Sequence, residues 1–362
     1  MAIKLEILNE RRVVMMRWTR ARHGDPHPQY PEIDDRGTRA PEFSAITGMM
    51  EGKDAFVRLE RELIDNAADL YVKSSDDSKV AILEPADGKL PATARMDIKL
   101  SGVSGGNPNE STIEVRFGSL TGPILSRLLV RCFTRRRVTI TPHLVTIHNA
   151  AGIGGAPSAA NAAAIMTHVQ AIWRPCGVEF TVGAARNETV TFATANIVSD
   201  APFPGELATL LATNSVPNTI NAYFVRQIGT GGTLGYGFSR PSSVTFVTGN
   251  PGIILGDQAG GWVHDTPWAG NDLAHESGHF FRLWHPNNQQ PPTEREDTWS
   301  RRFLMHNNNT QVIMGNWKDD NGYGALAGSA RRGALLTHKH LPHIATDNGC
   351  STARGAILAG PY

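Results

Sequence analysis

Residues 272–285 read DLAHESGHFFRLWH, and this stretch dominates what the sequence predicts about fold and chemistry. Its start fits an α-helix on which His275 and His279, four residues apart, project from the same face. Two imidazoles placed in this way can hold one metal ion, and Glu276 beside them lies within reach of a water molecule on that ion. The sequence therefore predicts a helix that carries a catalytic metal site.

A third metal ligand is expected downstream of this helix. A continued helix would put His285 about 15 Å along the axis from His275, so the chain must turn back after His279 if His285 is to bind the same ion. Arg282 lies where this turn is expected and would have to accept a positive φ or a different turn, at a cost of about 1 kcal/mol. The alternative third ligand is a carboxylate, because catalytic zinc also accepts two histidines and one acid. The acidic candidates are Glu294, Glu296 and Asp297.

The spacing H-E-x-x-H-x-x-x-x-x-H resembles the long zinc motif of the metzincin metallopeptidases, H-E-x-x-H-x-x-G-x-x-H. Arg282 stands where the family has the glycine that permits a sharp turn. The resemblance implies that three histidines bind one catalytic Zn²⁺ ion: His275, His279 and His285. It also implies that Glu276 is the general base, which takes a proton from zinc-bound water as that water attacks a peptide bond. The resemblance therefore implies a zinc-dependent endopeptidase.

Residues 138–256 resemble the upper subdomain of the same family, with a strand, a long helix, further strands and a Gly-Tyr-Gly-Phe edge segment. In the family this edge strand pairs with an extended peptide substrate. The resemblance assigns substrate binding to Gly235, Tyr236, Gly237 and Phe238. The family also has a methionine turn beneath the metal, for which Met305 is the first candidate and Met314 the alternative.

Charge density divides the chain into two parts. Residues 1–137 hold 22 of the 35 Lys and Arg residues and 20 of the 34 Asp and Glu residues, and charges are far sparser beyond them. The first part has short alternating segments between Gly, Pro, Asn and Ser turns, which favours a β-sandwich, and residues 55–68 look like a short charged helix. We expect residues 1–137 to be a β-rich accessory domain that docks or inhibits, and residues 138–362 to be the zinc protease domain.

In the second part, predicted strands alternate with predicted helices. One helix has an apolar stripe at positions i, i+4, i+7 and i+8, formed by Ile165, Val169, Ile172 and Trp173. Pro175 and Gly177 end this helix. We therefore predict an α+β catalytic domain of the metzincin type, with a mixed twisted sheet and an active-site helix. The predicted β-rich, sandwich-like domain precedes it.

Composition narrows the choice of partners and location. With 35 Lys and Arg against 34 Asp and Glu, the chain has no basic excess for nucleic acid, and no apolar run is long enough to span a membrane. Residues 1–12 lack the apolar stretch of a Sec signal, so we expect a cytoplasmic protein, or a toxin or effector exported by a non-classical or injection-type route. The three cysteines allow one disulfide at most, and we expect buried free thiols.

Two functions other than proteolysis stay open. One is a catalytically silent, zinc-bound interaction protein, and the other is a structural component of a larger assembly. Residues 1–137 would then hold the docking partner, whereas an endopeptidase would act on a protein or peptide substrate.

Overall fold

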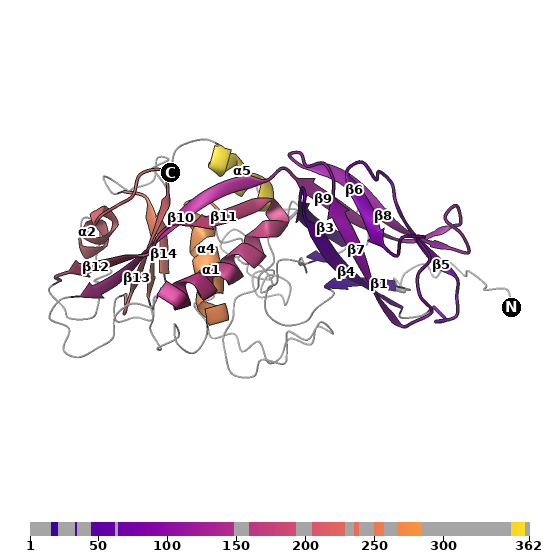
Figure 1. Ribbon diagram of the computed structural model, residues 1–362, viewed down its shortest axis with the longest axis horizontal. Helices are drawn as coiled ribbons and strands as arrows, with labels where there is room; N and C mark the ends of the chain where they lie inside the picture. The colour runs from indigo at the N-terminus through magenta and orange to yellow at the C-terminus, as the bar shows by residue number, and fades with distance from the viewer. Residues whose placement is uncertain are drawn as a thin grey trace, which may run out of the picture.

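The computed structural model describes residues 16–20, 33–34, 45–61, 64–147, 159–192, 205–228, 235–238, 250–256, 266–283 and 349–358. In Figure 1 these residues form two units that lie end to end, a β-sandwich and a second sheet with helices on its faces. Several predicted site residues lie outside the described residues: His285, Glu294, Glu296, Asp297, Met305 and Met314.

Two sheets form the sandwich. The first has the order β1-β4-β7-β6 and contains β1 (Met16–Arg20), β4 (Asp54–Arg61), β7 (Arg95–Gly102) and β6 (Val80–Glu84). The second has the order β2-β3-β9-β8-β5 and contains β2 (Ile33–Asp34), β3 (Ala45–Met50), β9 (Ile124–Phe133), β8 (Asn109–Phe117) and β5 (Leu70–Ser74). The indole N–H of Trp18 in β1 donates to the Ser126 hydroxyl in β9, 2.9 Å away, and so joins the two sheets through their core.

The helix predicted for residues 55–68 is wrong, because strand β4 occupies its first half. Ala55, Val57 and Leu59 are buried at every second position, which is the spacing of one face of a strand. Of the charged residues of β4, Arg58 lies between them on the opposite face and forms an ion pair with Asp97 on β7 at 2.8 Å. The charged residues of the range 55–68 suggested a solvated helix. Burial along β4 instead alternates every second residue up to Leu59, which is the pattern of a strand.

The second unit is built on a mostly parallel sheet with the order β11-β10-β13-β15-β14, in which β12 also pairs with β10. Its strands are β10 (Arg136–Ile147), β11 (Val178–Val182), β12 (Arg186–Val190), β13 (Ile220–Val225), β14 (Gly235–Phe238) and β15 (Gly252–Gly256). Strand β14 alone runs antiparallel to its neighbour, β15. The helices of this unit are α1 (Ala159–Trp173), α2 (Glu206–Ala212), α4 (Thr266–Phe280) and α5 (Gly349–Leu358).

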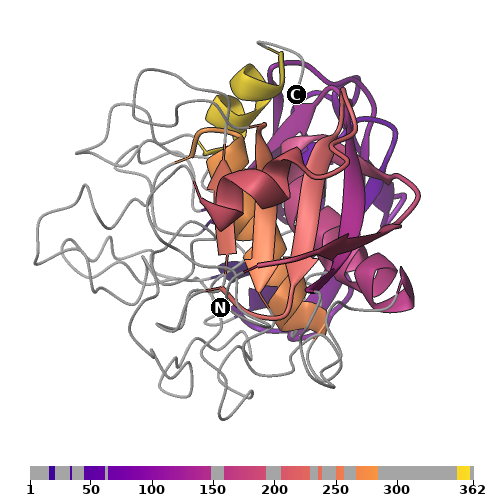
Figure 2. The same cartoon turned by 90° about the vertical axis from the view of Figure 1, so that its left-hand side faces the viewer.

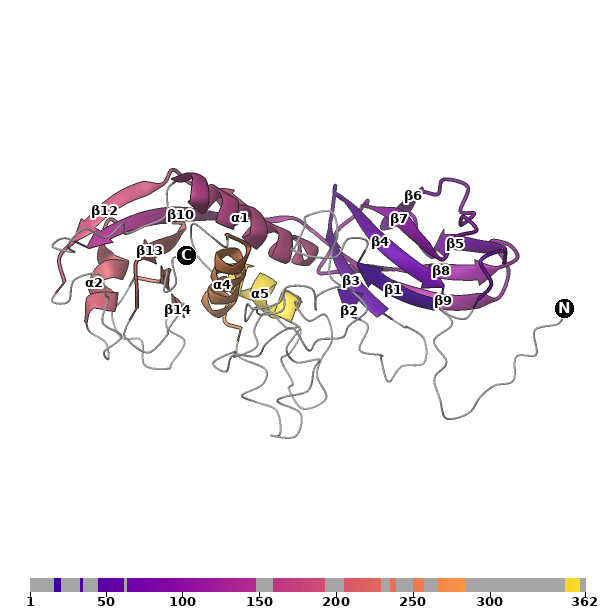
Figure 3. The same cartoon turned by 90° about the horizontal axis from the view of Figure 1, so that it is seen from below.

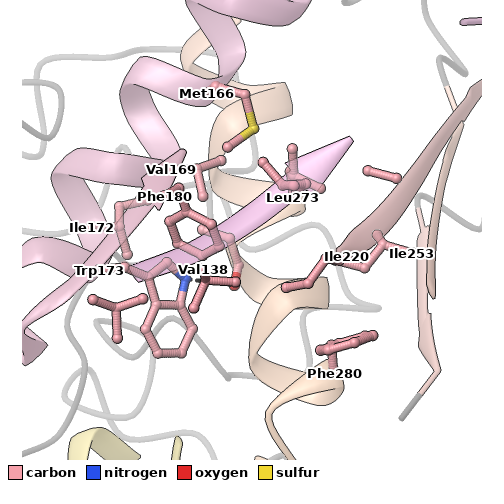
Figure 4. Packing of buried hydrophobic residues seen from close by; sticks show 14 of the residues in the cluster. Val138, Met166, Val169, Ile172, Trp173, Phe180, Ile220, Ile253, Leu273 and Phe280 are labelled. Carbon is pink, nitrogen blue, oxygen red and sulfur yellow. Dashed lines mark hydrogen bonds between the residues drawn. The ribbon is translucent and has the colours of Figure 1, made fainter. Parts of the chain in front are cut away.

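Helices cover both faces of this sheet. Alternate residues of β13 point to opposite sides, so that Phe224 packs under α1 and α4 while Tyr223 packs under α2. Figure 2, viewed from the end that carries α2, shows this helix in front of the strands. Figure 4 shows the core between α1, α4 and the sheet, where Trp173 lies among apolar side chains and its indole N–H donates to the Ala274 carbonyl at 3.2 Å. The apolar stripe predicted for α1 is buried along its whole length.

The predicted fold class is wrong. In the part of the chain that the structure describes, strands make up 48% and helices 21%, so these residues are mostly β-sheet and do not show the α+β metzincin catalytic fold. The prediction gave too much weight to one helical motif. Such a motif reports on a local stretch of chain, whereas strand pairing depends on contacts between segments far apart in sequence.

Helix α5 lies where the two units meet, as Figures 1 and 3 show. Its Arg354 is fully buried, and the guanidinium stands 5.0 Å from the centre of the Phe133 ring at the end of the sandwich. The short helix η1 (Arg174–Cys176) and Gly177 lie beside it, and a Cβ atom on Gly177 would come within 2.6 Å of the Phe133 Cβ. The two units are therefore closely packed at this junction.

The cysteines differ from the expectation of buried free thiols. Cys176 is disulfide-bonded, whereas Cys132 is a free, buried thiol in β9. The remaining cysteine of the chain is Cys350, which belongs to α5. Among the described residues, no helix has both the length and the apolar composition needed to cross a membrane.

Candidate active site

Helix α4 carries the three residues of the predicted metal site that the structure describes. His275 and Glu276 are 1% and 4% exposed, and His279, one turn further on, is half-buried. The helix lies close against α1 because Gly270 has no side chain: a Cβ atom there would meet the His168 Cβ at 2.5 Å. Burial against α1 on one side and the sheet on the other fixes the direction in which the α4 residues project.

The two imidazoles of α4 are neighbours, as their spacing predicts. The ring centroids of His275 and His279 are 4.8 Å apart, and the ring planes are nearly perpendicular at 88°. The His279 Nδ1–H donates to the Leu283 carbonyl oxygen, 2.9 Å away. A hydrogen on Nδ1 leaves the lone pair on Nε2, and a backbone carbonyl that fixes a histidine tautomer in this way is typical of zinc ligands.

The end of α4 turns the chain back after His279, as the motif requires. The Leu283 N–H donates to the Gly278 carbonyl at 2.8 Å and the Arg282 N–H to the His279 carbonyl at 2.9 Å, which is the Schellman pattern. Arg282 has φ +66°, a left-handed conformation that usually belongs to glycine at this position. Of the two possibilities expected for Arg282, a positive φ or a different turn, the structure has the positive φ. Where the chain carries His285 lies outside the described residues.

Strand β14 lies directly against this part of α4. A Cβ atom on Gly235 would come within 2.7 Å of the Glu276 Cγ, and one on Gly237 within 2.9 Å of the His279 Cβ. A side chain at either position would therefore force neighbouring atoms to shift, and at Gly237 these include the backbone carbonyl of Glu276. Of the predicted substrate-binding residues, Tyr236 and Phe238 are described only as backbone of β14. This strand forms one edge of the sheet as the structure describes it.

The described residues contribute two histidines and one carboxylate to the candidate site. Within the described part of the chain, no group of three or more His, Cys, Asp and Glu residues is placed to hold a metal ion. The donors that are present fit zinc, because two neutral imidazoles from one helix turn, one of them oriented by a carbonyl, are a common half of a zinc site. The candidates for a third donor, His285 and the carboxylates of Glu294, Glu296 and Asp297, lie outside the described residues.

A second polar cluster, which sequence analysis missed, lies on the α2 face of the sheet. The fully buried His143 ring stands 2.9 Å from the Glu188 carboxylate through Nδ1 and 2.9 Å from the Asn221 amide oxygen through Nε2. That amide oxygen also accepts from the Val216 N–H at 2.8 Å, so Nε2 must carry a hydrogen. The ring stacks on Tyr223 at 4.3 Å. The cluster ties three strands together, and its only sequence signal is a histidine inside a β-branched strand.

Comparisons with known proteins assign no family. No protein-family model matches the chain, and no curated protein matches it. Two solved structures from Caenorhabditis elegans show a slight likeness. One is SSP-19, an MSP-domain protein like family member, with 15% identity and a TM-score of 0.19 over 24% of this chain and 94% of that one. The other is WR4, an MSP family member, with 14% identity and a TM-score of 0.18 over 30% of this chain and 99% of that one. Likeness this slight supports no conclusion about function.

Proposed function

We propose that this chain is a zinc-dependent endopeptidase in which Glu276 is the general base and His275 and His279 are two of the zinc ligands. One observation carries the proposal. A single turn of α4 presents both imidazoles and the carboxylate, and Gly235 and Gly237 of a sheet-edge strand lie directly against this turn. The proposal rests on this local arrangement and not on the fold class.

The chain supplies three functions in this arrangement. Glu276 is positioned to accept a proton from the attacking water and to carry it to the leaving nitrogen of the peptide. The Leu283 carbonyl holds the His279 ring in the orientation that keeps Nε2 as the donor atom. Strand β14 would pair with an extended peptide, since an edge strand offers unpaired backbone groups. A bound zinc ion would supply Lewis acidity for the scissile carbonyl and for water.

The third ligand in this proposal is His285, and a carboxylate from Glu294, Glu296 or Asp297 is the alternative. The turn at Arg282 supports His285, because a continued helix would carry that residue away from the metal. The disulfide at Cys176 supports a place of action outside the reducing cytoplasm. We therefore propose an exported enzyme, with residues 1–137 as its docking module.

The test is cleavage of a denatured protein substrate by the zinc-loaded full-length chain, with bound zinc measured by elemental analysis. Glu276→Gln should keep one zinc ion per chain and lose cleavage by at least about 100-fold, which is the low end of the contribution of a general base. Glu110→Gln, on the exposed side of the sandwich, is the matched control and should cleave as the wild type does.

The outcomes separate the candidate functions. Removal of zinc with a chelator should abolish cleavage, and added zinc should restore it. Full activity in Glu276→Gln would refute the mechanism. One bound zinc ion without cleavage of any substrate would contradict the peptidase and support a zinc-bound interaction protein.

A further inference from the structure

We propose that Gly235 and Gly237 are positioning residues for the catalytic glutamate: their missing side chains let strand β14 close against α4, so that Gly235 confines the Glu276 carboxylate. This inference rests on the proposed function, because it adds a second role to β14, the strand that would bind the substrate. The two glycines are two residues apart in a strand, and both therefore face α4.

Gly237 determines how near the strand comes to the helix. A Cβ atom on Gly237 would lie 2.1 Å from the backbone carbonyl oxygen of Glu276 and 2.9 Å from the Cβ of His279. Backbone atoms of a packed helix cannot rotate aside as a side chain does. Any side chain at this position must therefore push β14 away from α4.

Gly235 acts on the Glu276 side chain and not on its backbone. A Cβ atom here would lie 2.7 Å from the Glu276 Cγ, 3.1 Å from its Cδ and 3.0 Å from a methyl carbon of Leu255. The backbone of β14 thus forms a wall against the middle of the glutamate side chain, which is 4% exposed. Because rotamers that point into this wall are excluded, the wall restricts where the carboxylate can lie.

The arrangement links substrate binding to the general base. A peptide paired with β14 would be held by the same backbone that confines the Glu276 side chain. Movement of this strand by a few tenths of an ångström would change both the position of the peptide and that of the carboxylate. A misplacement of about 1 Å can slow a catalysed reaction by about 100-fold.

The experiment compares Gly235→Ala and Gly237→Ala in the full-length chain with Gly355→Ala, a glycine of α5 at which a Cβ atom would meet nothing within 4 Å. For Gly235→Ala we expect kcat to fall by about 10-fold or more, with KM within about twofold and zinc content unchanged. Gly237→Ala should lower the melting temperature by several degrees and weaken zinc retention through His279. Gly355→Ala should resemble the wild type in all three measurements.

A stability cycle tests the contact without any activity measurement. Glu276→Ala removes the Cγ and Cδ atoms that a Cβ atom on Gly235 would meet, so Gly235→Ala should lower the melting temperature less in that background than in the wild type. The penalty of Gly237→Ala should persist there, because the carbonyl that it meets remains. This difference between the two glycines is specific to the proposed geometry.

The results distinguish the two proposals. If the wild-type chain cleaves nothing, the peptidase is refuted, while the stability cycle still decides whether the strand confines Glu276. An unchanged kcat in Gly235→Ala would overturn the positioning role even if the peptidase stands. Equal penalties for Gly235→Ala in both backgrounds would also overturn it, because the glutamate side chain would then not be what the new methyl group meets.

Discussion

The guanidinium of Arg354 donates a hydrogen bond to the carbonyl oxygen of Thr134, 2.8 Å away and 220 residues earlier in the chain. It also donates to the carbonyl oxygen of Cys176 at 3.2 Å and to that of Gly106 at 3.4 Å. These acceptors belong to the connection between the two units, to η1 and to a loop of the sandwich. One buried side chain of α5 therefore holds three segments of the junction together.

Replacing Arg354 should weaken this junction. Arg354→Met fills a similar volume but leaves the Thr134 and Cys176 carbonyl oxygens without a donor, each at a cost of about 1–3 kcal/mol. Burial of the guanidinium is itself unfavourable and lowers the Arg354 pKa to about 10. The substitution removes this unfavourable burial, which offsets part of the lost stability. We expect the free energy of unfolding to fall by about 2 kcal/mol, measured by denaturation in urea.

The control for Arg354 is Arg137→Met. The Arg137 side chain is 66% exposed and contacts Glu179 at 3.3 Å, so its loss should change stability by about 0.5 kcal/mol or less. Equal effects of the two substitutions would show that Arg354 does not stabilise the junction.

The folded protein should become more stable when Arg282 is replaced by glycine. Its φ of +66° costs a side chain about 1 kcal/mol, and the larger entropy of glycine in the unfolded chain offsets part of the gain. We expect Arg282→Gly to raise the free energy of unfolding by about 0.5 kcal/mol and to keep zinc and activity. Arg282→Val, β-branched at the same φ, should lower it by about 1–2 kcal/mol. Identical melting temperatures for the two variants would contradict the left-handed turn.

Glu188→Gln should be strongly destabilising, because it leaves His143 buried without the carboxylate beside it. Loss of a buried hydrogen bond that leaves its partner unsatisfied costs about 1–3 kcal/mol. The matched control is Asp97→Asn, which breaks a surface pair with Arg58 at 2.8 Å and should cost about 1 kcal/mol or less. Urea denaturation of both variants would measure the two changes in the free energy of unfolding. A Glu188→Gln effect no larger than that of Asp97→Asn would argue against a stabilising role for the buried cluster.

The cysteines should differ in reactivity. Burial raises the pKa of the Cys132 thiol to about 11, because desolvation disfavours the thiolate, so at pH 8 the folded chain should react very slowly with a thiol reagent. After unfolding without reductant, one thiol per chain should react, and reduction with a dithiol should raise the number to three. Three reactive thiols before reduction would rule out the disulfide at Cys176.

Part of the fold could be predicted because its signals are local. The apolar stripe of α1, the short alternating strands of residues 1–137 and the helical spacing of His275 and His279 all depend on residues a few positions apart. The turn after His279 was expected on the condition that His285 binds the same metal ion. Strand β4 was misread because its charged residues masked a period of two, and the fold class was wrong because one motif outweighed the many strands.

Only part of the candidate site could likewise be predicted from the sequence. The identity of Glu276 and the two histidines of α4 could be read from the sequence, whereas the need for glycine at 235 and 237 could not. That need arises from the approach of β14 to α4, two segments whose separation in sequence says nothing about their distance in space. The third ligand stays a prediction.

The sequence by itself determined the helix that carries His275, Glu276 and His279, because side chains four residues apart in a helix face the same way in any fold. Only the tertiary structure decided that β14 confines Glu276, that His143 pairs with Glu188 across the sheet, and that Arg354 joins the two units. The physical reason is that these contacts join residues separated by about 40 to 220 positions. Their energies depend on which segments the collapsed chain brings together, and no local pattern encodes that choice.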